Sequence, residues 1–421
     1  MLGGSRLWRH RDFLKLWSGQ TISVIGGEIT LLALPTLAIF RFHATAFIVG
    51  LLIAAQRLPF AGLTLFAGVL VDRVRRRPLM ILADAVRGLA LASIPVAFAL
   101  NAITLTQLFI VAVILGIGNV VFDIAYLAYV PALVGPQDIV EGNNKLTASF
   151  SIAMLAGPGL GGILVQAIGA AQALAANAVS YFVSVVTLAW IRQPEAAPVR
   201  DRQAGVFREM GEGLRLVFGH PLLRSLVAMM TTDSFAFQLV IPIFLVFFYR
   251  QLHLSPAQAG LVFASIGVGS LVGSVVAARF VAALGLGRAM AIGASGTMMV
   301  ALVPLALVLP AVPWLLLVFF FNALLMTVMD IQQVSLRQAL TPDRLQGRMN
   351  ATFRNLFWGV WPLANFLGGF TADSIGAVAV FLISAALGVI PVAIILSTPI
   401  GRLKSHDEVG VIQTLPLERE G

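Results

Sequence analysis

The sequence contains no cysteine among its 421 residues. Disulfide bonds, thiol catalysis and cysteine-ligated metal ions are therefore excluded. The five histidines are scattered, without the spacing that brings two ligands onto one metal ion. No Gly-Lys-Ser/Thr loop that could cradle nucleotide phosphates is present. We therefore expect neither a metal nor a cofactor, and any energy for work would have to come from an ion gradient.

Charged residues are scarce as well, at 11% of the chain against about 25% in soluble domains. Hydrophobic residues make up 59%, and the mean hydropathy is +0.93. A membrane-spanning helix needs about 20 mostly apolar residues, and segments of this kind recur along the whole chain. We predict about twelve of them, with approximate cores at 16–40, 46–69, 79–100, 105–130, 146–168, 173–191, 222–248, 257–281, 289–309, 314–335, 351–370 and 378–400. The composition therefore fits a polytopic membrane protein whose solvent is lipid.

The basic residues are unevenly distributed between the loops. With the N-terminus placed in the cytoplasm, most of the 28 lysines and arginines fall in cytoplasmic segments, whereas Arg41 and Arg250 lie in opposite loops and Arg57 and Arg87 within predicted spans. This positive-inside pattern places both termini in the cytoplasm and explains the net charge of +9 without nucleic-acid binding. The first apolar segment lacks a small-residue cleavage site, so we interpret it as an uncleaved helix.

The longest polar interruption, at about 192–220, divides the spans into two groups. We predict an N-terminal bundle over 1–192, a cytoplasmic linker over 193–220, a C-terminal bundle over 221–402 and a cytoplasmic tail over 403–421. The linker's apolar residues recur at helical spacing, which predicts an amphipathic helix on the inner membrane surface. These residues are Phe207, Met210, Leu214, Val217 and Phe218.

Matching positions recur between the two halves of the chain. Their offset stays close to about 206 residues in the pairs Pro136 and Pro342, Gly142 and Gly347, Gly162 and Gly369, and Gly169 and Gly376. A constant offset of this kind indicates duplication of a six-helix unit.

A basic motif lies between the second and third spans. It resembles the cytoplasmic signature of the major facilitator superfamily, Gly-x-Leu-x-Asp-Arg-x-Gly-Arg-Arg/Lys, at Gly68, Leu70, Asp72, Arg73, Arg76 and Arg77. The departure is Arg75, where the family usually has glycine. A carboxylate among guanidiniums can form charge-assisted pairs that break between two bundle arrangements, so we interpret Gly68, Asp72, Arg73, Arg76 and Arg77 as gating residues. The alternative is that the arginines only anchor a cytoplasmic loop.

The fifth span carries a second motif, Gly157-Pro158-Gly-Leu-Gly161-Gly162. It resembles the Gly-Pro-x-x-Gly-Gly sequence of drug/proton antiporters in the same superfamily. Glycines allow close helix approach and proline permits a bend, so we interpret Gly157, Pro158, Gly161 and Gly162 as gating elements where two bundles rock. The alternative is ordinary packing of small residues.

The resemblance extends over most of the chain, through Gly26-Gly27-Glu28 in the first span and Gly347-Arg348-Met-Asn350 after the tenth. The order of these segments is similar to that in macrolide-type efflux pumps and siderophore exporters. It implies an all-α integral membrane fold with twelve transmembrane helices in two pseudo-symmetric six-helix bundles. It also implies a monomeric, proton-coupled exporter of hydrophobic or amphipathic small molecules, working by alternating access. The excess of arginine over lysine, with abundant alanine and glycine, indicates a GC-rich bacterial genome. Together with the resemblance, it leads us to expect a multi-pass protein of the bacterial cytoplasmic (inner) membrane.

Other functions are compatible with the same scaffold, because fold does not fix substrate. Siderophore export, lysophospholipid movement and nutrient uptake are alternatives within transport. A non-transporting receptor or sensor is an alternative from another class, although no soluble sensing domain is visible. A membrane enzyme is not supported, because no nucleophile and base stand at catalytic spacing.

Acidic residues inside spans are costly in lipid and mark functional positions by default. Glu28 of the first span is our first candidate for reversible protonation, followed by Asp123, Asp233 and Asp330. The alternative for Glu28 is a permanent pair with Arg57 of the second span. Asp84 and Arg87, one turn apart, are interpreted as a structural pair near the cytoplasmic end of the third span.

Polar and aromatic residues also form stripes at helical spacing. Acids, amides, methionines and aromatic rings suit a cavity that binds amphipathic or cationic molecules. The alternative is that the tryptophans anchor helix ends and the methionines fill the core. The cavity candidates are Asn119, Tyr126, Phe237, Met326, Gln333, Trp358, Trp361 and Asn365.

Overall fold

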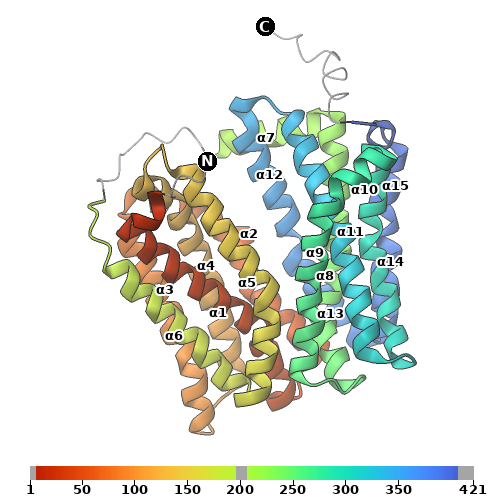
Figure 1. Ribbon diagram of the computed structural model, residues 1–421. Coiled ribbons are helices and arrows are strands. Elements are labelled where there is room, and N and C mark those ends of the chain that lie inside the picture. The colour runs from red at the N-terminus through yellow and green to blue at the C-terminus, as the bar shows by residue number, and fades with distance from the viewer. Residues whose placement is uncertain (1–5, 196–205, 406–421) are drawn as a thin grey trace. The chain divides into compact units, whose positions relative to one another are not determined.

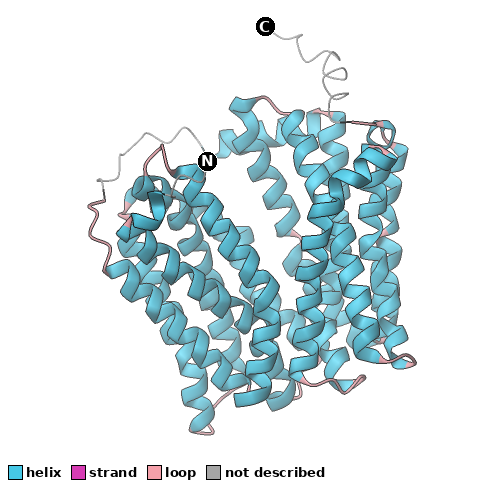
Figure 2. Ribbon diagram, in the orientation of Figure 1, coloured by secondary structure: helices cyan, strands magenta, loops and turns pink. Residues whose placement is uncertain are grey.

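The computed structural model describes residues 6–195 and 206–405 (Figure 1). Within these two ranges the regular elements are all helices (Figure 2). The predicted tail, except for its first residues, and part of the predicted linker lie outside the described residues. Eleven helical segments in the described ranges are long and apolar enough to cross a membrane. The predicted all-helical membrane fold is therefore confirmed.

Backbone contacts divide the chain into two compact units. Unit one comprises Met1–Arg202 together with Leu245–Ala264, and unit two comprises Gln203–Phe244 together with Ser265–Gly421. A short segment from the second half of the chain thus packs with the first half. Each unit has its own cluster of buried hydrophobic side chains.

Unit one is built mainly from the first six long helices. They are α1 (Arg11–Phe42), α2 (Ala46–Arg73), α3 (Arg76–Ala99), α4 (Leu105–Val134), α5 (Ile139–Ile168) and α6 (Ala170–Ala189), preceded by the short helix η1 (Arg6–Arg9). Helix α1 packs against α5 and α6, α3 packs against α4 and α6, and α2 packs against α4. These helices cover the first six predicted spans.

Side-chain caps start several of these helices. The Nδ1 atom of His10 accepts a hydrogen bond from the Phe13 amide at 3.0 Å, and Thr104 accepts one from the Gln107 amide at 3.2 Å. Each cap satisfies an amide that has no partner within the helix. Gly169, at φ 90°, joins α5 to α6 through a backbone conformation that residues with a side chain rarely adopt.

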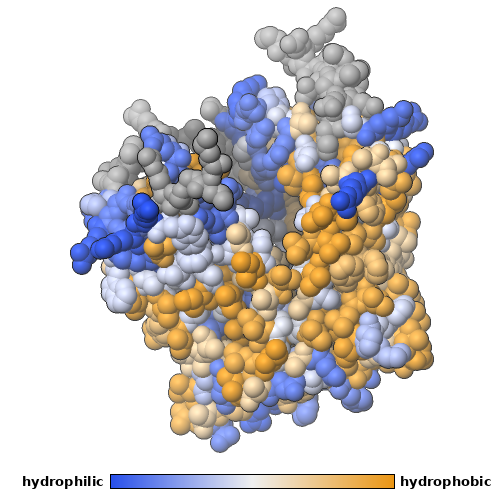
Figure 3. Space-filling view, viewed as in Figure 1, coloured by the Kyte–Doolittle hydropathy of each residue, from blue (hydrophilic) through white to orange (hydrophobic). Residues whose placement is uncertain are grey.

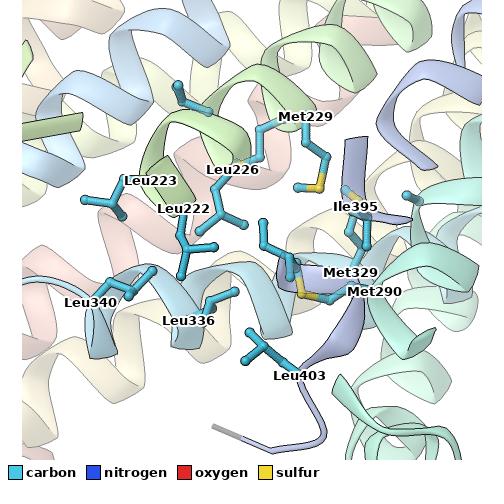
Figure 4. Packing of buried hydrophobic residues seen from close by; sticks show 14 of the residues in the cluster. Leu222, Leu223, Leu226, Met229, Met290, Met329, Leu336, Leu340, Ile395 and Leu403 are labelled. Carbon is cyan, nitrogen blue, oxygen red and sulfur yellow. The ribbon is translucent and has the colours of Figure 1, made fainter. Parts of the chain in front are cut away.

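Unit two contains most of the remaining helices, which are α7 (Val206–Gly219), α8 (Pro221–Arg250), α9 (Pro256–Leu284), α10 (Leu286–Ala294), η2 (Ser295–Leu307), α11 (Ala311–Ala339), η3 (Asp343–Leu345), α12 (Gln346–Gly359), α13 (Trp361–Ile375), α14 (Ala377–Leu387), α15 (Val389–Ser397) and η4 (Pro399–Arg402). The end of α8 and the start of α9 belong to unit one. The core of unit two joins leucines and methionines from α8, α10 and α11 with Ile395 of α15 (Figure 4). In the visible face of the molecule, hydrophobic residues cover the sides of the helices and hydrophilic residues gather toward their ends (Figure 3).

Three predicted spans are not single helices, and one of them, predicted over 378–400, is divided into α14, α15 and η4. The span predicted over 351–370 is split between α12 and α13 at Val360. Pro362 has no amide hydrogen and its ring collides with the carbonyl four residues earlier, so a helix tends to break there. The span predicted over 289–309 changes from α10 to the 3-10 helix η2 at Ser295. Asn322 of α11 donates a hydrogen bond to the Gly296 carbonyl at 2.8 Å, which gives that carbonyl a partner outside its own helix.

The linker helix predicted from apolar spacing is present as α7. Val217 is buried in the core of unit two, whereas Phe218 is 48% exposed. Helix α7 packs on α12, where Glu212 forms an ion pair with Arg348. A Cβ at Gly213 would lie only 2.9 Å from the Arg348 carbonyl oxygen, so glycine permits this close packing. Its position on the membrane surface stays a prediction.

Candidate functional site

Unit one encloses a polar cavity of about 210 Å³ between α1, α2, α3, α4 and α6. Its acidic and basic lining side chains come from four different helices: Glu28, Arg57, Arg87 and Asp123. The remaining lining residues include Gln20, Ser23, Thr30, Gln56, Asn119 and Tyr181. Opposite charges inside membrane-spanning helices are thus gathered at one place, where they can balance one another.

Glycines bring the cavity's helices together. A Cβ at Gly116 of α4 would overlap the carbonyl of Gln56 on α2, so the two helices touch through their backbones. A Cβ at Gly118 would come within 2.6 Å of the Arg87 side chain, so this glycine makes room for the arginine. A Cβ at Gly157 of α5 would overlap the side chain of Glu28. Glycines therefore make room for two of the charged side chains of the cavity, Arg87 and Glu28.

Arg87 is held by several contacts at the edge of the cavity. It forms an ion pair with Asp84 and donates a hydrogen bond to Asn119 Oδ1 at 2.5 Å. Its guanidinium lies 4.6 Å from the ring centre of Phe122 and 4.5 Å from that of Tyr181, which is within the range of cation–π attraction. The predicted pairing of Asp84 with Arg87 is confirmed. Arg87 also lines the cavity, a role that the sequence alone did not indicate.

Glu28 and Asp123 share the cavity with Arg57. The guanidinium of Arg57 interacts electrostatically with both carboxyl groups. The pairing of Glu28 with Arg57 that the sequence left open is therefore accompanied by a second acid. Asp123 is exposed, whereas Glu28 is only partly accessible. Two acids that compete for one arginine give the cavity alternative charge arrangements, and protonation of either acid would favour the other pair.

Unit two encloses a larger cavity of about 570 Å³ between α8, α11 and α12. Its charged lining residues are Asp330, Arg337 and Arg354, and Arg337 interacts electrostatically with Asp330. The rest of its lining is largely apolar, with Met230, Phe353, Phe357 and Trp358. The guanidiniums of Arg337 and Arg354 lie 5.1 and 5.9 Å from the ring centres of Phe353 and Trp358. The predicted Gln333 and Trp358 both line this cavity.

Several predicted site residues lie elsewhere in their units. Asp233 is buried and accepts a hydrogen bond from Thr297 Oγ1 at 2.7 Å, and Trp361 Nε1 donates to Ser234 Oγ at 2.7 Å. Asn365 donates to Gln238 Oε1 at 3.2 Å. The others are Tyr126, whose ring stacks 6.1 Å from that of Phe122, Phe237, 6.3 Å from the ring of Phe244, and Met326, which packs near Gly296. Their binding of a substrate or a proton stays a prediction.

The basic motif between α2 and α3 is anchored to the end of α6. The Glu195 carboxylate accepts hydrogen bonds from the amides of Arg76 and Arg77, at 2.6 and 3.1 Å. The Arg77 side chain donates to the carbonyls of Leu188 and Ala189, at 2.8 and 2.5 Å. Glu195 therefore caps α3, and Arg77 caps α6. Sequence reasoning missed Glu195, since its partners lie far away along the chain.

The motif's departure from the family pattern has a simple explanation. Arg75 has φ −65° and ψ 132°, an extended conformation that any residue adopts. Glycine is therefore not required there. A Cβ at Gly68 would meet no atom within 4 Å. The side chain of Asp72 lies outside what the structure describes, so gating by Gly68, Asp72, Arg73, Arg76 and Arg77 remains a prediction.

The glycines of the second motif face two different partners. A Cβ at Gly161 would lie 3.2 Å from the Ile29 Cα of α1, so Gly161, like Gly157, serves the packing of α5 on α1. A Cβ at Gly162 would lie 2.8 Å from Gly260 Cα of α9. Gly260 in turn faces the carbonyl of Pro158. Gly162 and Pro158 therefore carry the contact with the segment from the second half of the chain, and Gly161 does not.

Comparisons with known proteins agree with this fold. Residues 6–416 match the family described as transmembrane secretion effector. The multidrug efflux pump Tap of Mycolicibacterium fortuitum is 27% identical over 371 residues, covering 85% of this chain and 88% of the pump. The enterobactin exporter EntS of Citrobacter koseri is 24% identical over 386 residues, covering 90% and 86%.

Solved structures show the same architecture. A bacterial homologue of the iron transporter ferroportin, in its inward-facing state, superposes with a TM-score of 0.75 at 16% identity. The match covers 92% of this chain and 98% of that one. The chain therefore belongs to the transmembrane secretion effector family, within the major facilitator superfamily, and it is a multi-pass membrane transporter and not an enzyme.

Proposed function

We propose that this protein is a proton-coupled exporter of hydrophobic or amphipathic small molecules that works by alternating access in the bacterial inner membrane. The observation that carries the proposal is the cavity of unit one. Glu28 of α1 and Asp123 of α4 line it together with Arg57 of α2 and Arg87 of α3. This arrangement supports a proton site, because each carboxyl group can be either protonated or balanced by a guanidinium.

The coupling we propose is a competition for arginine. When Glu28 is protonated, Arg57 loses the attraction of that acid and keeps the attraction of Asp123. When Glu28 is ionised, both acids attract Arg57. Because the acids are on α1 and α4, this exchange changes which helices are held together. Proton binding would then shift the balance between two bundle arrangements, as coupling requires.

The substrate class is suggested by the cavity of unit two. Its aromatic rings and methionine offer apolar contact, and Asp330 offers a negative charge. Such a lining suits flat organic molecules with an apolar body and few charges. The names of the relatives, a multidrug efflux pump and an enterobactin exporter, support export as the direction.

A transport assay in inside-out membrane vesicles tests the proton site. We expect Glu28→Gln to abolish the uptake of a fluorescent organic cation such as ethidium into inside-out vesicles under an imposed pH gradient. Glutamine keeps the shape of the glutamate side chain but cannot bind and release a proton. Counterflow of ethidium without a gradient should persist. Glu141→Gln is the matched control, because Glu141 lies on the same unit and pairs with Lys145 at its surface. Gradient-driven transport at the wild-type rate by Glu28→Gln would remove Glu28 from the mechanism.

A second candidate substrate is an organic anion of the siderophore type. Two arginines and one aspartate charge the cavity of unit two, which gives it a net positive lining. Arginine forks bind carboxylates and other planar anions well. The same vesicles distinguish the two candidates. Inhibition of ethidium transport by a catecholate anion, lost in Arg354→Gln, would favour the anion, whereas inhibition by organic cations alone would favour the drug-like substrate.

A further inference from the structure

We infer that a basic pocket at the start of α1 and the end of α6 binds the phosphate of an anionic phospholipid. The pocket measures about 890 Å³ and belongs entirely to unit one. It is separate from the polar cavity described above, with which it shares no lining residue. Its basic lining residues are Arg9, His10, Arg11, Lys15 and Arg192.

The acidic residue that lines the pocket, Asp12, already accepts hydrogen bonds from neighbouring protein groups. Asp12 accepts a hydrogen bond from Lys15 Nζ at 2.6 Å and from the amides of Arg192 and Gln193, at 3.1 and 2.9 Å. Within residues 6–195 and 206–405, no carboxylate lies within ion-pair distance of the guanidiniums of Arg9, Arg11 or Arg192. The pocket thus presents three arginines whose charge an incoming anion can neutralise.

The helix ends around the pocket also favour an anion. The N-terminus of the long helix α1 opens here, with His10 as its cap. The opposing carbonyl end of α6 is neutralised by Lys15, which donates to the Trp190 carbonyl at 2.7 Å. Asp12 in the first turn of α1 offsets part of the positive end of that helix dipole, whereas the negative end of α6 is covered by the Lys15 cation. The carbonyl end of α6 therefore does not cancel the field of the three arginines.

An apolar strip on α6 leads from the pocket along the outside of the unit, which indicates a lipid and not a free phosphate. Trp190 lines the pocket and is 64% exposed, and Val186 and Val179 are 43% and 59% exposed. Spacings of four and seven residues place the three side chains on one helix face. An exposed apolar face of a membrane-spanning helix contacts acyl chains, and tryptophan favours the headgroup level. A phospholipid whose phosphate lies in the pocket would therefore place its acyl chains along α6.

Native mass spectrometry of the full chain tests this inference. The protein is equilibrated with phosphatidylglycerol or with zwitterionic phosphatidylcholine, and retained lipids are counted. Basic pockets at membrane surfaces bind anionic headgroups with a strength that rises with each arginine. We expect Arg9→Gln/Arg11→Gln/Arg192→Gln to weaken phosphatidylglycerol retention by about 10-fold to 100-fold. The matched control is Arg279→Gln/Arg288→Gln/Arg402→Gln, which removes three exposed arginines of unit two and should leave this site unchanged.

Two further variants distinguish binding of a phospholipid from binding of a soluble phosphate, and a specific loss of binding from misfolding. Trp190→Ala should weaken phosphatidylglycerol retention without affecting competition by inorganic phosphate, because only the chains contact the tryptophan. Arg9→Lys/Arg11→Lys/Arg192→Lys keeps the charge and should retain most of the binding. Equal retention of both lipids by the wild-type protein, or equal losses in the two glutamine triples, would overturn the inference. Full displacement by inorganic phosphate, with no effect of Trp190→Ala, would assign the pocket to a soluble phosphate compound.

Discussion

The two units hold their charges in different ways. In unit one, two acids and two arginines from four helices line a cavity of about 210 Å³. In unit two, a cavity of about 570 Å³ is lined by aromatic residues, and its charges come from α11 and α12 only. Because these charges are on four separate helices, a change in the protonation of one acid alters the electrostatic attraction between all four helices. Aromatic walls with charges on two helices provide contact area but fewer such links. We therefore propose that coupling belongs to unit one and substrate contact to unit two.

The packing of the units is nevertheless similar. In unit one, Gly161 of α5 lies against Ile29 of α1, and in unit two Gly368 of α13 lies against the backbone of Leu239 of α8. These pairs stand at offsets of about 207 and about 210 residues, close to the repeat found in the sequence. The duplicated frame keeps its glycine contacts, whereas the cavity linings have diverged.

The largest expected effect concerns the buried pair of unit one. Arg87→Gln would leave the Asp84 carboxylate, which is 0% exposed, without its ion-pair partner. Removing one member of a buried pair costs about 3 to 5 kcal/mol. Asp233→Asn in unit two keeps a hydrogen bond with Thr297 and should cost only about 1 kcal/mol. Thermal unfolding of the purified variants, followed by size-exclusion chromatography, measures both.

A double variant shows whether the unpaired charge of Asp84 causes the loss of stability in Arg87→Gln. Asp84→Asn/Arg87→Gln removes both charges and should recover much of the stability lost in Arg87→Gln. Equal melting temperatures for Arg87→Gln and Asp233→Asn would contradict the contrast that we draw between the units.

An intermediate effect is expected at the glycine contacts. A Cβ at Gly368 would overlap the Leu239 carbonyl oxygen, whereas one at Gly161 would lie 3.2 Å from Ile29 Cα. Overpacking of a close contact costs about 1 to 3 kcal/mol, so Gly368→Ala should lower the melting temperature more than Gly161→Ala. Gly62→Ala is the control, because a Cβ there meets nothing within 4 Å. A larger loss of stability in Gly161→Ala than in Gly368→Ala would contradict the conclusion that the contact of Gly368 with Leu239 is the tighter of the two.

The smallest expected effect is a pH dependence at the start of α8. Burial lowers the pKa of His220 below its ordinary value of 6.5, and its Nδ1 accepts a hydrogen bond from the Leu223 amide at 3.5 Å. The unfolded chain therefore binds a proton more readily, so the contribution of His220 to stability is present above about pH 6.5 and is lost as the pH falls further. The loss should be at most about 1 kcal/mol.

Two substitutions isolate this cap. His220→Asn keeps a capping acceptor without a titrating group, so its melting temperature should fall less than that of the wild type between about pH 7.5 and about pH 5.5. His220→Ala should be less stable than His220→Asn throughout. A pH dependence in His220→Asn as steep as in the wild type would assign it to another group.

The ionisable residues show how far the sequence could lead. Glu28, Asp123 and Asp330 were found as acids within apolar segments, and the structure places each in the lining of a cavity. Arg57 and Arg87 carried the same signal, a charge inside a predicted span, but were interpreted only as partners of nearby acids. Helical spacing indicates neighbours on one helix, whereas Arg87 also reaches Asn119 on another helix.

The sequence by itself determined that this protein is a helical membrane protein, because length, hydropathy and arginine placement act locally and lipid tolerates few alternatives to helices. The resemblance of its motifs to the major facilitator superfamily then indicated a transporter. The sequence also determined most helix positions and the internal repeat. Only the tertiary structure decided which charges meet, and that Gly162, not Gly161, faces Gly260. These features depend on contacts between helices far apart along the chain, and such contacts follow from side-chain volume and helix rotation, which no local pattern encodes.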